Sequence, residues 1–131
     1  MRLVVDASVA VEYLLRTALG RLVAPRIEEA ELLAPELLDA EVLAVLRRAH
    51  LAQRLGEARA RQALQDLYDW PVRRLAHRPL VPLGWSFRKN LSAYDALYVA
   101  AARLHEAHLL TADGPLSRAP RVGVVIENVR A

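Results

Sequence analysis

Apolar residues follow two different spacings along the chain, and each spacing predicts a different element. Short aliphatic runs are typical of buried strands, whereas apolar residues three or four positions apart indicate amphipathic helices. The runs predict strands at residues 2–5, 32–34, 72–76, 108–111 and 122–126. The helical spacing predicts helices at residues 7–16, 20–30, 36–53, 57–70, 80–89 and 91–107, with Pro25 limiting where the second can begin.

The third and fourth predicted helices each have a defined apolar face. These faces are formed by Leu38, Val42, Val45 and Ala49, and by Ala60, Leu64, Leu67 and Tyr68. Because strands alternate with helices throughout, the sequence predicts the α/β class, as a three-layer α/β/α domain with a mainly parallel central sheet of four or five strands. We expect a single domain over residues 1–131, with its functional crevice at the carboxyl ends of the strands.

The composition excludes several classes of protein. The chain has 131 residues, of which 54% are hydrophobic and 25% charged, so it can bury a core and intrinsic disorder is excluded. It contains no cysteine, which excludes disulfides, a thiolate nucleophile and sulfur-ligated metals, and which fits a reducing cytoplasm. No apolar run approaches the roughly 20 residues of a membrane span, and we expect no signal peptide.

The basic residues of the chain are almost all arginines. The net charge is +3, from 18 basic residues of which only Lys89 is a lysine. Arginine suits bidentate contact with phosphate or carboxylate, but solvated surface faces explain the same excess. The charge alone therefore identifies no partner.

Four carboxylates adjoin or interrupt apolar segments: Asp6, Glu41, Asp95 and Asp113. Asp6 and Asp113 each follow the end of a predicted strand, and the carboxyl ends of parallel strands share one edge of a sheet. Helical spacing turns Glu41 and Asp95 towards the packed sides of their helices. If the four side chains converge, their mutual repulsion raises their pKa values and favours a hard divalent cation such as Mg²⁺ or Mn²⁺.

Ordinary structural roles are open for three of these acids. Asp6 is placed to cap the helix that follows it, and Ser92 with Asp95 has the spacing of a capping box. Asp113 and Gly114 are typical of a turn. Capping and metal binding are compatible roles. Glu41 has the weakest structural explanation, because a glutamate in mid-helix on an apolar face needs a partner there.

Four sequence stretches, each containing one of the acids, are similar to the motifs of a known family. They are VVDASVA from Val4, APELLDAEVLAVLRR from Ala34, LSAYDALYVAA from Leu91 and LLTAD from Leu109. The chain resembles PIN-domain proteins and, among them, the VapC-like toxin ribonucleases of toxin-antitoxin pairs. The stretches span nearly the whole chain in the family's order, and the third is the most specific.

The resemblance implies a PIN-like domain whose catalytic acids are Asp6, Glu41, Asp95 and Asp113. It implies a metal site formed by Asp6, Asp95 and Asp113, with Asp113 acting through water or on a second ion. Glu41 joins this site directly or through water. Ser8 and Thr111 match small hydroxyl positions that hydrogen-bond the carboxylates or metal-bound water.

The resemblance further implies an endoribonuclease toxin that cleaves single-stranded or looped RNA with Mg²⁺ or Mn²⁺. It implies two partners, a VapB-like antitoxin and a second copy in a homodimer, with a cytoplasmic location and no membrane association. Substrate phosphates need cations outside the acid cluster. The candidates are Arg73, Arg74, Arg78, Arg88 and Lys89, for which a solvated surface role stays open.

Other interpretations fit less well. A receiver domain requires a lysine late in the chain, whereas Lys89 precedes the fourth predicted strand. A haloacid-dehalogenase-like phosphatase requires a second aspartate where Ser8 stands, and a P-loop protein requires a glycine-rich lysine motif that the sequence lacks. His105 and His108 suggest zinc, but one lies near a helix end and the other begins a strand. The main alternative is a non-catalytic PIN-like RNA-binding or scaffolding protein.

Overall fold

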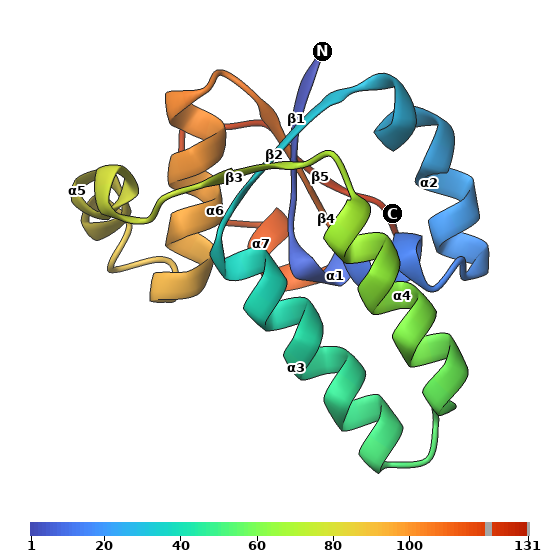
Figure 1. Cartoon of the computed structure of the whole chain (residues 1–131). Coiled ribbons are helices and arrows are strands. Elements are labelled where there is room, and N and C mark those ends of the chain that lie inside the picture. The colour runs from blue at the N-terminus through green and yellow to red at the C-terminus, as the bar shows by residue number, and fades with distance from the viewer. Residues whose placement is uncertain (120–121, 131) are drawn as a thin grey trace.

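A parallel sheet forms the centre of the fold, as the computed structural model shows for residues 1–119 and 122–130 (Figure 1). Its strands are β1 (Arg2–Val5), β2 (Glu31–Pro35), β3 (Arg73–Leu75), β4 (His108–Thr111) and β5 (Ile126–Asn128). Their order is β3-β2-β1-β4-β5, and every neighbouring pair is parallel. The predicted α/β class is confirmed, and the sheet, expected to be mainly parallel with four or five strands, has five strands that are all parallel.

Helices flank this sheet, with α5 and α6 to its left in Figure 1 and α1, α2 and α4 to its right. The helices are α1 (Ala7–Leu14), α2 (Ala18–Glu29), α3 (Leu37–Leu51), α4 (Glu57–Asp69), the 3-10 helix η1 (Arg78–Leu80), α5 (Val81–Ser86), α6 (Ala93–Leu104) and α7 (Gly114–Ser117). This is the predicted three-layer arrangement. Among the described residues, no helix has the length and apolar character to cross a membrane.

The central position of β1 explains its composition. Leu3, Val4 and Val5 are fully buried because both faces of the sheet are covered, which is the setting that favours continuous aliphatic strands. β4 lies directly beside β1, with Val5 opposite Leu110. The residues that follow these two strands therefore meet at the carboxyl edge of the sheet.

The structure differs from the sequence prediction at β5 and on the apolar face of α4. The last strand is Ile126–Asn128 rather than residues 122–126, because Gly123 has a positive φ of 69° and the chain pairs with β4 only from Ile126 onwards. Tyr68 is 83% exposed, so its expected place on the apolar face of α4 is wrong. That helix buries Ala63 and Leu67, and Tyr68 stands about 100° further around its axis than Leu67.

Two prolines modify the expected helices without preventing them. Pro25 lies inside α2, whose start is fixed by Thr17, since the Thr17 side chain accepts a hydrogen bond from Gly20 N at 3.0 Å. The helix predicted at residues 80–89 begins earlier, as η1 with Pro79 in its first turn, and continues as α5. Both helices keep the α/β order of the prediction.

We expect Gly20→Ala to lower the free energy of unfolding by about 2 kcal/mol, because overpacking at a backbone contact forces the elements apart. A Cβ at Gly20 would stand 2.0 Å from the carbonyl oxygen of Glu12, where α2 approaches α1. Gly56→Ala is the matched control, since a Cβ there meets no atom within 4 Å. Denaturant titration of both variants measures the difference, and equal losses would contradict the close approach.

Candidate active site

The sheet edge brings the first and fourth acids into the same region. The Asp6 N–H donates to the Leu110 carbonyl at 3.2 Å, which continues the pairing of β1 with β4 by one residue. Asp113 follows Thr111, the last residue of β4, by two positions. Both acids therefore lie just beyond the carboxyl ends of neighbouring strands, as the sequence predicted.

Asp6 and Asp113 also begin helices. Asp6 Oδ1 accepts a hydrogen bond from Val9 N at 3.2 Å at the start of α1, which confirms the predicted cap. Asp113 Oδ1 accepts one from Leu116 N at 3.2 Å at the start of α7. The turn expected at Asp113 and Gly114 is wrong, because this carboxylate caps a short helix there.

Two hydroxyl groups hold the carboxylate of Asp6. Ser8 Oγ donates to its Oδ1 at 2.6 Å, and Thr111 Oγ1 donates to its Oδ2. Each hydroxyl also accepts a backbone N–H, Ser8 from Ala112 at 2.8 Å and Thr111 from Asp113 at 2.9 Å. Asp6 is only 6% exposed, so this network fixes the direction of its carboxylate.

Asp95 reaches the same region from the first turn of α6. Ser92 Oγ accepts a hydrogen bond from Asp95 N at 3.1 Å, so the predicted cap at Ser92 is confirmed. Burial raises the pKa of Asp95, and the charges of Asp113 and Asp6 raise it further. The three aspartates are therefore close enough to repel one another.

The pKa of Asp6 reflects opposing effects. Burial raises it most, hydrogen bonds from Ser8 and Thr111 lower it, and the charge of Asp113 raises it. In the described part of the chain, neither these acids nor Glu41 form an ion pair. Among the described residues, the groups that donate hydrogen bonds to the carboxylates of Asp6, Asp113 and Glu41 are all neutral.

Glu41 extends from α3 to a partner that sequence analysis did not identify. Tyr98 Oη donates to Glu41 Oε1 at 2.7 Å, and Tyr98 is 1% exposed. Burial and this hydrogen bond raise the pKa of Tyr98, and the charges of Asp6 and Asp95 add to the increase. Glu41 thus shares the neighbourhood of the aspartates. The available signal was that Tyr98 stands three residues after Asp95, on the same side of α6.

The chemistry of these donors fits a divalent cation. Within residues 1–119 and 122–130, no three histidine, aspartate or glutamate side chains lie together in an arrangement that could hold a metal ion. Mg²⁺, however, commonly takes only one or two carboxylates and keeps several waters. The raised pKa values of Asp6 and Asp95, the nearby charge of Asp113 and the lack of a cationic partner among the described residues fit such an ion.

The two histidines considered for zinc have separate surroundings. His105 is the C-cap residue of α6, and its backbone N–H bonds back to that helix. His108 opens β4, where its Nδ1 lies 3.1 Å from Glu127 Oε1. Arg26 also pairs with Glu127 and, with His108, lowers the pKa of Glu127 to about 2. Arg26, Glu127 and His108 therefore form a structural ion-pair group. They are not part of the acid edge, by which we mean the region of Asp6, Asp95 and Asp113.

Two of the arginines proposed to contact RNA are displaced from the acid edge or already engaged. Arg73 of β3 pairs with Leu33 of β2, and Leu33 pairs with Val4 of β1. Arg73 therefore lies before the end of the sheet at which Asp6 lies. Arg74 does not remain free, because its guanidinium pairs with Asp39 at 3.0 Å and donates to backbone carbonyls. Arg74 therefore joins β3 to α3 and α4, and its guanidinium is already engaged within the protein.

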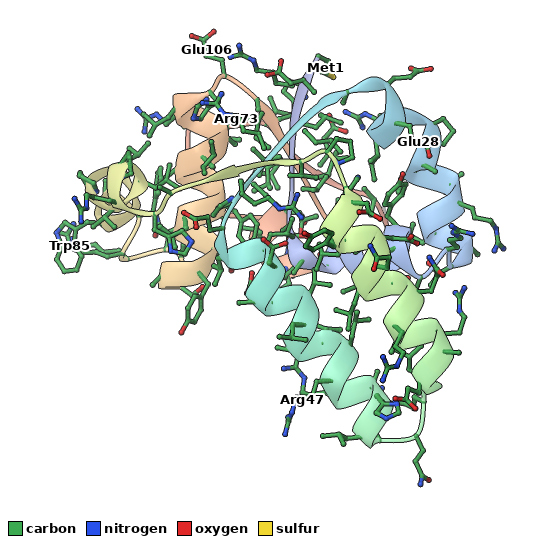
Figure 2. The ribbon with its side chains drawn as sticks, in the orientation of Figure 1. Met1, Glu28, Arg47, Arg73, Trp85 and Glu106 are labelled. Carbon is green, nitrogen blue, oxygen red and sulfur yellow. The ribbon has the colours of Figure 1, made fainter. Side chains whose placement is uncertain are left out.

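The remaining candidates lie on the α5 side of the molecule. Arg88 stacks on Trp85, with its Cζ 4.9 Å from the ring centroid. Trp85 is 67% exposed and lies at the outer end of α5 (Figure 2). Arg78 and Lys89 are exposed. These cations are available to solvent, and Lys89 is the nearest of them in sequence to α6 and Asp95.

Comparison with known proteins agrees with this architecture. The PIN domain family matches residues 3–122. Ribonuclease VapC1 of Mycobacterium tuberculosis is 45% identical over 98 residues, which are 74% of each chain. VapC ribonuclease Mb0985 of Mycobacterium bovis is 42% identical over 115 residues, 88% of each chain. Ribonuclease VapC12 of M. tuberculosis is 32% identical over 127 residues, 97% of this chain and 98% of the relative. The matched region contains all four acids, and the chain belongs to the PIN domain family, where it is similar to the VapC ribonucleases.

Proposed function

We propose that this chain is an endoribonuclease toxin of a toxin-antitoxin system. The observation that carries the proposal is that Asp6 and Asp113 lie beyond the carboxyl ends of neighbouring strands, with Asp95 of α6 close enough for their charges to raise its pKa. An acid cluster of this kind suits phosphodiester hydrolysis. The relatives are named ribonucleases, which supports RNA as the substrate.

Magnesium or manganese is the cofactor that this donor set favours. Asp6, Asp95 and Asp113 would hold it, with Asp113 acting through water or on a second ion, and Glu41 would join directly or through water. When bound, the ion activates water and stabilises charge that develops on the phosphate. Ser8 and Thr111 orient Asp6 before any ligand arrives, since both already donate to its carboxylate.

The carboxylates also have roles of their own in the proposed reaction. An attacking water needs a proton acceptor, and either Glu41 or Asp113 provides one at the cluster. Tyr98 donates to only one oxygen of Glu41, which leaves the other oxygen for such a contact. Attack on phosphorus in line with the departing 3′ oxygen then cleaves single-stranded or looped RNA.

We further propose a VapB-like antitoxin as the partner, a homodimer as the assembly and the cytoplasm as the location, with residues 1–131 forming one PIN-like domain. A hollow of about 380 Å³ between α1, α2 and α4 supports a docking segment with both apolar and charged side chains, since Leu14 and Trp70 line it together with Arg21 and Asp66. The rings of Tyr13 and Trp70 stack at its wall, with centroids 5.2 Å apart. Val81 and Trp85 on α5 are exposed apolar side chains suited to a second protein surface.

We expect purified protein to cleave structured RNAs in Mg²⁺ or Mn²⁺ and to stop in chelator. Asp6→Asn and Asp95→Asn should each lower the cleavage rate at least about a hundredfold, since the ion and its water lose a ligand. The cations should also raise the thermal midpoint of the wild type and raise that of Asp95→Asn much less. Gel electrophoresis of the RNA and thermal melting provide the two measurements.

Absence of cleavage in either metal would favour the alternative, a non-catalytic PIN-like RNA-binding or scaffolding protein. Equal cleavage by the wild type and both variants would exclude the acid cluster as the site. Asp69→Asn, on the exposed face of α4, is the control for the loss of one carboxylate. It should cleave as the wild type does.

Without added cation, we expect Asp95→Asn to be more stable than the wild type at pH 7. The raised folded pKa of Asp95 means that the protonated form favours folding. That contribution is fully present below the unfolded value of 3.8 and is lost as pH rises through the folded value. The advantage of Asp95→Asn should therefore shrink towards pH 3.5. Urea titrations at both pH values measure the difference in unfolding free energy between Asp95→Asn and the wild type, with Asp69→Asn as the control. A larger difference at pH 3.5 than at pH 7 would refute the prediction.

Tyr98→Phe should reduce stability by about 1–2 kcal/mol, because it leaves the part-buried Glu41 carboxylate without its donor. It should also raise several-fold the Mn²⁺ concentration that gives half of the maximal thermal shift, since Glu41 is then free to turn. Tyr94→Phe, on the exposed side of α6, is the matched control. A stability loss with no change in the Mn²⁺ response would assign Tyr98 to the core alone.

A further inference from the structure

An arginine that sequence analysis did not single out lies beside the acid edge. Arg118 is the C-cap residue of α7, the helix that Asp113 begins. Its guanidinium folds back over the first residue of that helix. A Cβ built on Gly114 would stand 2.9 Å from Arg118 Nη1 and 3.5 Å from Nη2. The positive charge therefore covers the residue next to Asp113.

Helix geometry explains this placement. Gly114 and Arg118 are four residues apart, so they share one face of α7. Long side chains on a helix point back towards its N-terminus, which carries the guanidinium from Arg118 towards the sheet edge. Gly114 has no side chain, so the guanidinium occupies the space that a Cβ would fill.

The charge at this position is available to a ligand. Arg118 is exposed and forms no ion pair with any other residue in the described ranges. The Oδ1 of neighbouring Asp113 is directed to the backbone of α7 instead. The surrounding acids repel a polyanion, and a guanidinium at their rim offers the bidentate geometry that phosphate prefers.

We propose that Arg118 binds a backbone phosphate of the RNA strand at the rim of the acid cluster, and that Gly114 keeps the space in which its guanidinium lies. This inference rests on the proposed function, since it names a substrate contact of the same site. Arg118 is a substrate-binding residue here. Arg118 positions the RNA strand through one phosphate, and the phosphodiester that is cleaved lies at the acids.

The matched control is Arg103, which is also an exposed arginine lying over a glycine. Its Nε is 3.5 Å from the Cβ position of Gly123. It stands in the last turn of α6, however, at the opposite end of that helix from Asp95. Arg103→Gln therefore removes the same charge in a similar setting far from the acids.

The test measures binding of a fluorescent single-stranded RNA to Asp95→Asn protein at several salt concentrations. Adding Arg118→Gln should weaken binding about three- to tenfold and reduce the slope of log K against log salt by about 0.7, the value for one phosphate contact on a single strand. Arg103→Gln should leave the slope unchanged. Arg118→Lys should bind RNA more tightly than Arg118→Gln and more weakly than Arg118, because lysine keeps the positive charge but lacks the paired N–H groups of the guanidinium.

Gly114→Ala supplies an independent arm, because a Cβ displaces the guanidinium while the arginine remains. It should weaken binding in the same direction, and Gly114→Ala combined with Arg118→Gln should bind no worse than Arg118→Gln alone. Additive losses, or equal slopes for Arg118→Gln and Arg103→Gln, would overturn the proposal. Thermal melting of each variant separates these outcomes from unfolding.

Parallel cleavage assays with the wild type and with Arg118→Gln alone, both of which keep Asp95, separate the two proposals. If the wild-type protein cuts RNA and Arg118→Gln alone leaves the Michaelis constant unchanged, the phosphate contact is wrong while the enzymatic function stands. If the wild type binds RNA without cutting it, and the salt slope still depends on Arg118, the endoribonuclease proposal is wrong while the phosphate contact stands.

Discussion

The site depends on one constraint, the repulsion between aspartates that are partly buried near the carboxyl ends of β1 and β4. Burial raises the pKa values of Asp6 and Asp95, and the neighbouring charges raise them further. Hydroxyl and backbone N–H donors stabilise single carboxylates, yet they leave the summed charge in place. Because no arginine or lysine in the described ranges neutralises these acids, the fold retains a negative site that a bound cation or protonation of the acids would relieve.

The sequence was sufficient where the signals are local. The cap formed by Asp6 involves Val9, three residues away, and the cap at Ser92 involves Asp95, also three residues away. The buried run of β1 marks a central strand without any knowledge of its neighbours. Parallel pairing then places the ends of β1 and β4 together, which is why two of the four acids were correctly expected at one edge.

Long-range contacts were not predictable in the same way. Glu41 and Tyr98 are 57 positions apart, and a buried tyrosine in an apolar helix has the pattern of an ordinary core residue. Arg74 resembled a solvated cation because nothing near it in sequence shows that Asp39 and the end of α4 lie within reach. β5 was placed too early since Gly123 redirects an aliphatic run that otherwise suits a strand. Each case depends on which helix and loop surfaces meet.

The charges at the site also indicate which group would bind the RNA and which would neutralise the acids. One guanidinium at the rim cannot offset several carboxylates, because each carboxylate repels a phosphodiester about as strongly as one arginine attracts it at the same distance. Arg118 therefore suits the placing of a strand, and neutralisation of the acids is left to the divalent ion that the proposed function requires. RNA binding and cation binding then favour each other, since a bound cation reduces the repulsion that the RNA meets and bound RNA adds negative charge that attracts the cation. In these two proposals, Arg118 at the end of α7 contacts the RNA, and Asp95 at the start of α6 contacts the cation.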